Sequence, residues 1–574
     1  MRRIGLPAGL LLAVFLLRLP TVIGEWGFAS TDETSWICRN IAPMLLGDLN
    51  PRLFEYPAGV VFTLVPGAYA LVYGIGHAAG YYGTLPDFVA LMRAEPWAFA
   101  VIGRLMTVLA GALGVVALHR LALRVADPGV ATWAAGSFGL MVPFATITCF
   151  HYVDVPAIAC LLFALPLCLD IREGRRDTRT LVKCGLVFGT LVNLKIPYVL
   201  CVVAVAAALW LAPDRARRVA PRPELARLRP AWIVIGLGAM IAVIARRIVL
   251  PATYDPSLAL GVGAVANFRR SVLALAALTV AAGLAAVVLA PARRVLNAAL
   301  LSRTARVTAL TGAVTFLAWS PYYFADPTET VMGVMRMMRP VDWEVVGPRP
   351  PTFHALILRR STSELLGLPM GLLGLAGIAV ALARRDPRDL VVLSPVGTWF
   401  AYTGFAAYTK LSLMYLYAPF LALYGARLAR DICGPNYHAL LAVALLPAAV
   451  TCAGRAWTNA TVPRVDTRQE LRAWYRAACP SGEPVAQDPG LLIHDDRNPD
   501  YYQPLLCERD LGQLKASGVR YLLTNDNIDR AYHVADEKSA AFRAELALRA
   551  TPVTTFSTDG GRKAGPPIQV WRLR

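Results

Sequence analysis

Two short acidic segments carry the side chains that are best suited to catalysis in an otherwise apolar chain. Asp32 and Glu33 are adjacent, and Asp154 follows His151 by three residues. A carboxylate of this kind can take a proton from a hydroxyl as a general base. An acid at the start of a helix is also a common N-terminal cap, so the alternative is that Asp32 and Asp154 only begin helices.

Three cations stand near the same predicted membrane face as these acids. Arg104 lies inside an apolar run, Lys195 precedes a break at Pro197, and Lys410 lies at the outer end of a later run. A buried arginine in a membrane segment is costly and usually faces a partner or a polar cavity, although its side chain can instead extend to the interface. Cations bind phosphate through strong charge-assisted hydrogen bonds. Acids and cations together predict the transfer of a group from a lipid phosphate to an external acceptor.

The composition places these residues in a membrane. Of 574 residues, 56% are hydrophobic and 17% are charged, whereas soluble domains are about 45–50% apolar and about one-quarter charged. Apolar runs recur from Ile4 to Gly454, and a spanning helix needs about 20 apolar residues. The composition excludes a water-soluble enzyme, a disordered chain and a collagen-like fibre, and it predicts an α-helical polytopic membrane protein.

The net charge of +19 does not predict a nucleic-acid partner, because the arginines separate apolar runs as they do in cytoplasmic loops. If each of the six basic groups faces the cytoplasm, every interval between them holds an even number of crossings. The result is about 13 transmembrane helices, with an uncleaved first helix at residues 4–23 and the C-terminal tail outside. The six groups are Arg120 and Arg124; Arg172, Arg175, Arg176, Arg179 and Lys183; Arg215, Arg217, Arg218, Arg222, Arg227 and Arg229; Arg293, Arg294, Arg303 and Arg306; Arg384, Arg385 and Arg388; and Arg427 and Arg430.

Residues 57–79 decide this count, because the segment is also long enough to cross the membrane. A crossing there would place Arg120 and Arg124 outside. The segment contains Pro66 and several glycines, and we therefore predict a juxtamembrane or re-entrant element.

The tail differs in character from the rest of the chain. We predict a transmembrane domain at residues 1–459 and a small extracytoplasmic α/β domain at residues 460–574. The tail has one helical patch and two strand-like runs, separated by aspartates and glycines. Its two cysteines, Cys479 and Cys507, would form a disulfide in an oxidising compartment or remain as two thiols. The other eight cysteines show no paired spacing typical of a zinc or redox site.

The order of the polar segments resembles that of the GT-C glycosyltransferases. It is most similar to the group that contains the bacterial protein O-mannosyltransferases and the aminoarabinose transferases. The resemblance implies a GT-C-like fold, a polyprenyl-phosphate-linked sugar as donor, and a glycan, lipid or protein as acceptor. It also implies a bacterial cytoplasmic membrane, with the active site and the C-terminal domain on the periplasmic side. The matching segments are Asp32-Glu33, residues 55–59, Arg104 with Ala110-Gly111, residues 151–156, residues 193–197, and Lys410 with residues 415–420.

The same resemblance implies roles for the individual residues. Asp32 would be the general base of an inverting transfer, and Glu33 and Asp154 would position the acceptor or a divalent cation. Arg104, Lys195, Lys410 and His151 would bind the substrates, with the cations on the phosphate. Some similar proteins hold a divalent ion near the first-loop acids; Asp32, His151 and Asp154 have suitable chemistry, but their spacing leaves the metal undecided.

A long outer loop at residues 325–363 is the last feature with a predicted role. Its methionines and Trp343 make it too apolar for a disordered linker. We predict that it lies on the membrane surface, where Arg336 and Arg339 face phosphates and the loop covers the polyprenyl chain or gates the acceptor. The alternative is a surface helix that only anchors the loop.

Three other classes of protein are alternatives to a glycosyltransferase. A transporter or flippase usually shows inverted repeats and charges near the bilayer midplane, whereas here the charges gather at one face. A non-catalytic scaffold that presents the C-terminal domain gives no reason for Asp32, Arg104 and Asp154 to share a side. A lipid-linked polymerase or ligase without an aspartate base is the third alternative.

Overall fold

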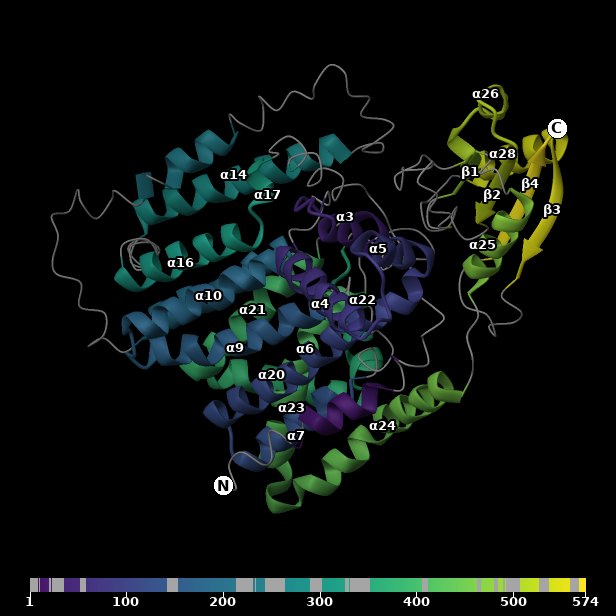
Figure 1. Ribbon diagram of the computed structural model, residues 1–574. Helices are drawn as coiled ribbons and strands as arrows, with labels where there is room; N and C mark the ends of the chain where they lie inside the picture. Colours follow the sequence, from purple (N-terminus) through teal and green to yellow (C-terminus); the bar gives the residue numbers. More distant parts are fainter. Residues whose placement is uncertain are drawn as a thin grey trace.

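The computed structural model shows a bundle of helices followed by a small domain with a four-stranded sheet (Figure 1). The residues that the structure describes are 9, 11–19, 22, 36–51, 58–141, 153–212, 231–232, 234–242, 264–289, 302–325, 330, 352–404, 411–461, 466–479, 484–488, 491, 506–525, 536–557 and 567–574.

The helical part contains long α-helices interrupted by short 3₁₀ and π segments. In chain order its elements are η1 (Trp36–Ile41), α3 (Ala42–Leu45), α4 (Gly59–Ala78), α5 (Leu85–Ala94), α6 (Pro96–Val125), α7 (Pro128–Gly139), α9 (Asp154–Arg172), α10 (Thr178–Leu194), η2 (Ile196–Val202), α11 (Val203–Trp210), α14 (Ala264–Val288), α16 (Arg303–Trp319), α17 (Tyr322–Ala325), α19 (His354–Arg360), η4 (Ser361–Leu365), α20 (Leu368–Arg384), α21 (Pro387–Gly404), α22 (Leu411–Met414), η5 (Tyr415–Tyr417), α23 (Ala418–Cys433), η6 (Gly434–Asn436) and α24 (Tyr437–Thr461).

The structure confirms a mostly helical multi-pass membrane protein, but it does not confirm the predicted count of about 13 spans. Four helical stretches of the described chain are long and apolar enough to cross a membrane. Three further apolar helical stretches of the described chain are shorter: Ile196–Trp210, Val272–Val288 and Leu368–Arg384. The first of them is short because the chain breaks before Pro197. The four stretches are Gly59–Ala78, Ala98–Val125, Asp154–Arg172 and Ser412–Gly454.

Small residues allow the helices to pack closely. A Cβ atom on Gly189 of α10 would lie 2.4 Å from the carbonyl oxygen of Gly312 in α16, and one on Gly377 of α20 would lie 2.1 Å from that of Tyr424 in α23. Such contacts are typical of membrane bundles, where close backbone packing takes the place of a hydrophobic driving force.

Helices α6 and α9 run in the same direction and define two ends of the bundle. Arg124, near the end of α6, binds Asp170, near the end of α9, at 2.8 Å. At the other end, a Cβ on Gly111 of α6 would lie 3.4 Å from the side chain of Val155 in the first turn of α9. The 19 residues of α9 are about 28 Å long, close to the ~30 Å of a hydrocarbon core. We call these ends the arginine-rich end and the Asp154 end.

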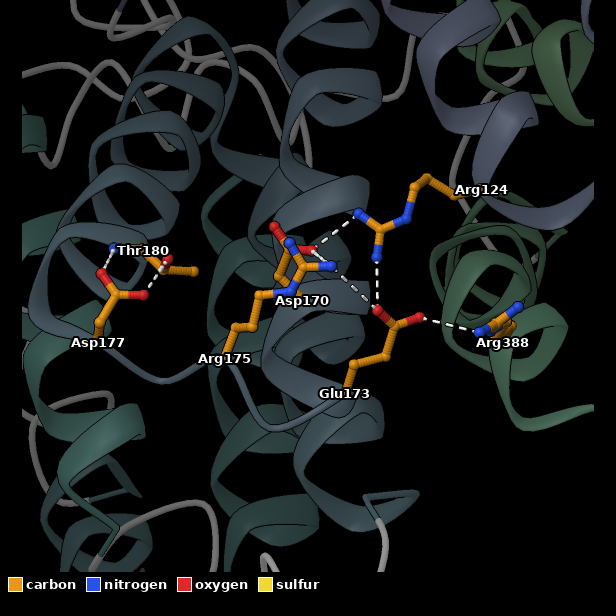
Figure 2. Close-up of polar contacts among 7 residues, drawn as sticks. All are labelled: Arg124, Asp170, Glu173, Arg175, Asp177, Thr180 and Arg388. Atoms are coloured by element: carbon orange, nitrogen blue, oxygen red, sulfur yellow. Dashed lines mark hydrogen bonds and ion pairs between the residues drawn. The ribbon is translucent and has the colours of Figure 1, made fainter.

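An ion-pair network joins three helices at the arginine-rich end (Figure 2). Arg124 also binds Glu173 at 2.7 Å, and Glu173 binds Arg388 at the start of α21 at 3.2 Å. Asp177 starts α10 by accepting a bond from the backbone of Thr180 at 3.0 Å, and its bonds with Thr180 hold the pKa of the Asp177 carboxyl below its ordinary value. These groups are partly exposed, so each pair adds about 0–1 kcal/mol and the network mainly fixes the register of the helix ends.

Contacts of α4 favour the prediction that this helix does not cross the membrane. Its second residue, Val60, donates its backbone N–H to Asn193 near the end of α10 at 3.0 Å. Midway along α4, Tyr69 donates its hydroxyl to the carbonyl of Phe99 in the first turn of α6. Both contacts lie at the Asp154 end. The helix that returns the chain to α6 is α5, and its 10 residues span only about 15 Å, so α5 is too short to bring the chain back across a bilayer.

The C-terminal domain is an α/β unit with a mixed sheet of order β1-β2-β4-β3. β1 and β2 are parallel, and β4 runs antiparallel to both β2 and β3. Leu471 of α25 packs with Leu523 and Val570 of the sheet. Cys479 and Cys507 are two thiols rather than a disulfide. The elements are α25 (Thr467–Ala478), β1 (Val485–Gln487), η7 (Leu506–Glu508), α26 (Leu511–Ala516), β2 (Tyr521–Asn525), α28 (Asp536–Arg549), β3 (Ala550–Phe556) and β4 (Ile568–Leu573).

Two arginines of α25 attach this domain to the bundle. Arg472 donates to the carbonyl of Arg93 at 2.9 Å, and Arg476 donates to that of Ala94 at 3.4 Å. These carbonyls end α5, where backbone acceptors lack partners within the helix. Burial lowers the pKa of the Arg472 guanidinium from its ordinary value. The domain therefore docks on the element that leads into α6.

A cysteine at position 81 tests whether α4 crosses the membrane. Tyr81, in the turn after α4, is 84% exposed, and Leu49, before α4, is 75% exposed. With exposed natural cysteines replaced by serine, Tyr81→Cys and Leu49→Cys should both react with an impermeant maleimide in intact cells. Arg175→Cys, at the arginine-rich end, should react only after permeabilisation. Protection of Tyr81→Cys in intact cells alongside a reactive Leu49→Cys would show that α4 crosses.

Candidate active site

Three of the predicted site residues lie in the described part of the chain: Arg104, Asp154 and Lys195. All three lie at the Asp154 end. The other six lie outside the described residues, so their roles stay predictions; these are Asp32, Glu33, His151, Arg336, Arg339 and Lys410.

Asp154 and Lys195 form a buried ion pair. The Lys195 ammonium lies 3.0 Å from each carboxylate oxygen of Asp154, and the Tyr198 hydroxyl donates to Oδ1 at 2.9 Å. Asp154 is 2% exposed. The alternative that Asp154 caps α9 is wrong, because Val153 occupies the cap position and its side chain makes no capping bond. Buried charges need this kind of compensation, because an unpaired carboxylate is costly in an apolar interior.

The break predicted at Lys195 brings this side chain to Asp154. α10 ends at Leu194, and Lys195 is extended, with φ −160° and ψ 118°. Pro197 lacks an N–H to continue the hydrogen-bond ladder of α10, and its ring would clash with the carbonyl four residues before it if the α-helix continued. The chain continues as the 3₁₀ helix η2, which presents Tyr198 to the same carboxylate.

Aromatic side chains join this ion pair to later parts of the chain. Tyr198 stacks on Trp399 of α21 with ring centroids 4.7 Å apart. Trp399 is fully buried and donates its indole N–H to the carbonyl of Leu413 at 2.7 Å. Thr403, one turn along α21, bonds the hydroxyl of Tyr417 in η5 at 2.8 Å. Three segments singled out in the sequence, near residues 154, 195 and 415, therefore meet in space.

Asn193 connects a further segment to this region, although the sequence predicted no separate role for this residue. Its side-chain oxygen accepts from Val60 at the start of α4, and its nitrogen donates to Ser320 Oγ at 2.7 Å and to the carbonyl of Phe316 at 3.1 Å. Asn193 is fully buried. The available signal was an amide in an apolar helix just before a break, because buried polar groups must be hydrogen-bonded.

Arg104 is fully buried on α6, which excludes the alternative that its side chain extends to solvent at the interface. It precedes Gly111 by seven residues, or about 10 Å of helix. Since Gly111 lies beside the first turn of α9, Arg104 lies beyond the level of Asp154, toward the first turn of α6. A cation held there suits the anionic head of a lipid at the membrane boundary.

The described residues do not fit a metal ion. Both oxygens of Asp154 are bonded to Lys195, and Tyr198 adds a third bond. Among the residues that the structure describes, no group of three His, Cys, Asp or Glu side chains is arranged to hold a metal. The geometry gives Asp154 the task of holding Lys195 in place.

Comparison with known proteins shows the fold. No protein-family model matches the chain, and no curated protein sequence matches it. The chain is similar to the oligosaccharyltransferase of Archaeoglobus fulgidus tethered with an acceptor peptide containing the NVT sequon (13% identity, 95% of this chain and 72% of that chain, TM-score 0.50).

Two further solved structures show weaker likeness. They are archaeal oligosaccharyltransferase AglB from Archaeoglobus fulgidus, in complex with an inhibitory peptide and a dolichol-phosphate (13% identity, 96% and 73% covered, TM-score 0.48), and ArnT from Cupriavidus metallidurans bound to undecaprenyl phosphate (12% identity, 98% and 97% covered, TM-score 0.45). The likeness at a TM-score of 0.50 confirms the predicted GT-C-like fold.

A double-mutant cycle tests the Asp154–Lys195 pair. Asp154→Asn or Lys195→Met alone leaves one buried partner uncompensated and should lower the free energy of unfolding by about 3–5 kcal/mol. The double variant should lose less than the sum of the two. The measurement is thermal unfolding in detergent, with Asp177→Asn, an exposed cap at the arginine-rich end, as the control of small effect. Strictly additive losses would show that the two side chains do not stabilise one another.

Proposed function

We propose that the chain is an integral membrane glycosyltransferase that moves a sugar from a polyprenyl-phosphate donor to an acceptor hydroxyl outside the cytoplasm. The observation that carries the proposal is that the buried Arg104, the Asp154–Lys195 pair and the Asn193 contacts all lie at the same end of a GT-C-like bundle. The first-loop acids, Asp32 and Glu33, precede η1, which packs against α4, α5 and α6 at that end.

In the proposed reaction, Asp32 takes the proton from the acceptor hydroxyl. The acceptor oxygen then attacks the anomeric carbon from the side opposite the phosphate, and the bond between that carbon and the phosphate oxygen breaks. The configuration inverts, and polyprenyl phosphate leaves with the bonding electrons. Glu33 orients the acceptor. Negative charge develops on the leaving phosphate, where fixed cations stabilise the transition state more than the ground state.

Arg104, Lys195, Lys410 and His151 are the proposed contacts to the donor. Lys195 directs two of its three N–H donors to the oxygens of Asp154, so it retains one donor for a phosphate. Asp154 thereby fixes the position of the Lys195 ammonium group, since the carboxylate is itself held by Tyr198. We assign Asp154 to positioning rather than to proton transfer.

The proposed location is a bacterial cytoplasmic membrane, with the Asp154 end on the periplasmic side. The arginine-rich end would face the cytoplasm, as the distribution of Lys and Arg in membrane proteins predicts. The transporter alternative calls for charges near the midplane, whereas the ion pairs of α9 lie at its two ends.

Replacement of Asp32 tests the proposed base. Asp32→Asn keeps the size and polarity of the side chain but removes the base, so we expect turnover to fall at least ~10²-fold with normal membrane insertion. Mass spectrometry of lipids, cell wall and exported proteins from a deletion strain first identifies the missing glycan. Purified variants are then assayed with that acceptor. Glu33→Gln, the neighbouring control, should lose less. Near-wild-type transfer by Asp32→Asn would reject its role.

The outer loop is tested by a double substitution. Arg336→Ala with Arg339→Ala removes the two charges predicted to face phosphates and should raise the KM of the donor or the acceptor without changing membrane insertion. The measurement is initial-rate kinetics with each substrate varied in turn. Unchanged kinetics for both substrates would leave the loop with an anchoring role alone.

A further inference from the structure

Arg18 is a buried arginine of the N-terminal helical segment at residues 11–19, and the catalytic proposal gives it no role. It is 2% exposed, and its guanidinium donates to the carbonyl of Gly139 at 3.4 Å. Gly139 ends α7, where backbone carbonyls lack partners within the helix and carry partial negative charge. A charge inside a membrane bundle is costly and usually functional.

Two glycines create the space that Arg18 and its helix occupy. A Cβ atom on Gly111 of α6 would lie 2.3 Å from Nη1 of Arg18, and one on Gly139 would lie 2.7 Å from the side chain of Val14. Val14 and Arg18 are four residues apart, so they lie on one face of the helix. The N-terminal helical segment is therefore held against α6 and α7 by two close contacts.

The place of Arg18 along the bundle connects it with the candidate active site. The same Cβ position on Gly111 lies 3.4 Å from the side chain of Val155, the residue after Asp154. Arg18 thus lies at the level where α9 begins, near the Asp154 end. Fourteen residues farther along the chain is Asp32.

We propose that Arg18 is a positioning residue for the transfer reaction. By fixing the outer part of the N-terminal helix in the notch at Gly111 and on the carbonyl of Gly139, it sets the point from which the first outer loop leaves the membrane. Asp32 is carried on that loop. A displacement of about 1 Å at a reacting group can reduce the rate about 10²-fold. This inference rests on the proposed function, in which Asp32 is the base.

Gly111→Ala tests the notch without removing any charge. Its new methyl group would occupy the place of Nη1, so the guanidinium must move. We expect kcat to fall about 10-fold or more, with the KM of donor and acceptor within twofold of wild type. Arg18→Met should lose more, and Arg18→Lys should recover part of the loss because it keeps a donor toward Gly139. The matched control is Gly136→Ala, on α7, where a Cβ meets nothing within 4 Å.

Kinetic and pH data separate positioning from the alternatives. If Asp32 remains the base, the acidic limb of the pH–rate profile for Arg18→Lys keeps the wild-type midpoint while its height falls. A raised donor KM with unchanged kcat would overturn the proposal in favour of phosphate binding by Arg18. A loss of kcat that only follows the fraction of folded protein, measured by thermal unfolding, would overturn it in favour of a purely structural role.

A cross-link reports the seating of the helix without any assay of transfer. The pair Val14→Cys and Gly139→Cys should form a disulfide on mild oxidation, and adding Gly111→Ala should reduce the yield, whereas adding Gly136→Ala should not. An unchanged disulfide yield with Gly111→Ala would contradict the proposal that the space beside Gly111 seats Arg18. Normal transfer by Asp32→Asn would reject the proposed base. A cross-link yield reduced by Gly111→Ala would still support the anchoring of the helix, so failure of the proposed function and failure of the anchoring proposal can be told apart.

Discussion

A carboxylate at the start of an apolar helix must be compensated, and the arrangement of the Asp154 end follows from how this is done. Asp154 is nearly inaccessible to solvent and takes its three hydrogen bonds from Lys195 and Tyr198. Those bonds require α10 to end at Leu194 and η2 to place Tyr198 beside the first residue of α9. Stacking of Tyr198 on Trp399 then fixes α21. A buried pair of this kind is expensive to break, so it sets the relative positions of three helices at the end where the proposed chemistry takes place.

Local rules predicted the features that depend on neighbouring residues. Composition predicted a helical membrane protein, Pro197 predicted the break that places Lys195 beside Asp154, and the polar tail predicted an α/β unit. The order of short motifs predicted the GT-C-like fold, which the structure confirms. The alternative that Asp154 only caps α9 was wrong: Val153 occupies the cap position without a capping bond, and the Asp154 side chain binds Lys195.

Contacts between distant segments were beyond what the sequence could predict. Asn193 binds the backbone of Val60, and Arg18 binds the backbone of Gly139. In both cases the partner is a main-chain group more than 100 residues away, and almost every residue carries such a group. The type of the partner residue therefore gives no signal. The number of spans was hard to predict for a related reason, because α4 has the length and hydropathy of a span while its contacts hold it at one end of the bundle.

The ion pairs at the two ends of α9 differ in how far they are exposed to solvent. At the arginine-rich end, the side chains of Arg124 and Asp170 are 27% and 18% exposed, whereas those of Lys195 and Asp154 are 11% and 3% exposed. Solvent weakens the first pair, and several arginines share its acids, so the loss of one contact leaves others in place. The second pair has no such redundancy among the described residues. A site that must hold a cation in a fixed position requires a strong and specific partner for that cation, as Asp154 is for Lys195. The docking of α25 on the end of α5, directly before α6 and Arg104, extends the same fixed framework to the C-terminal domain.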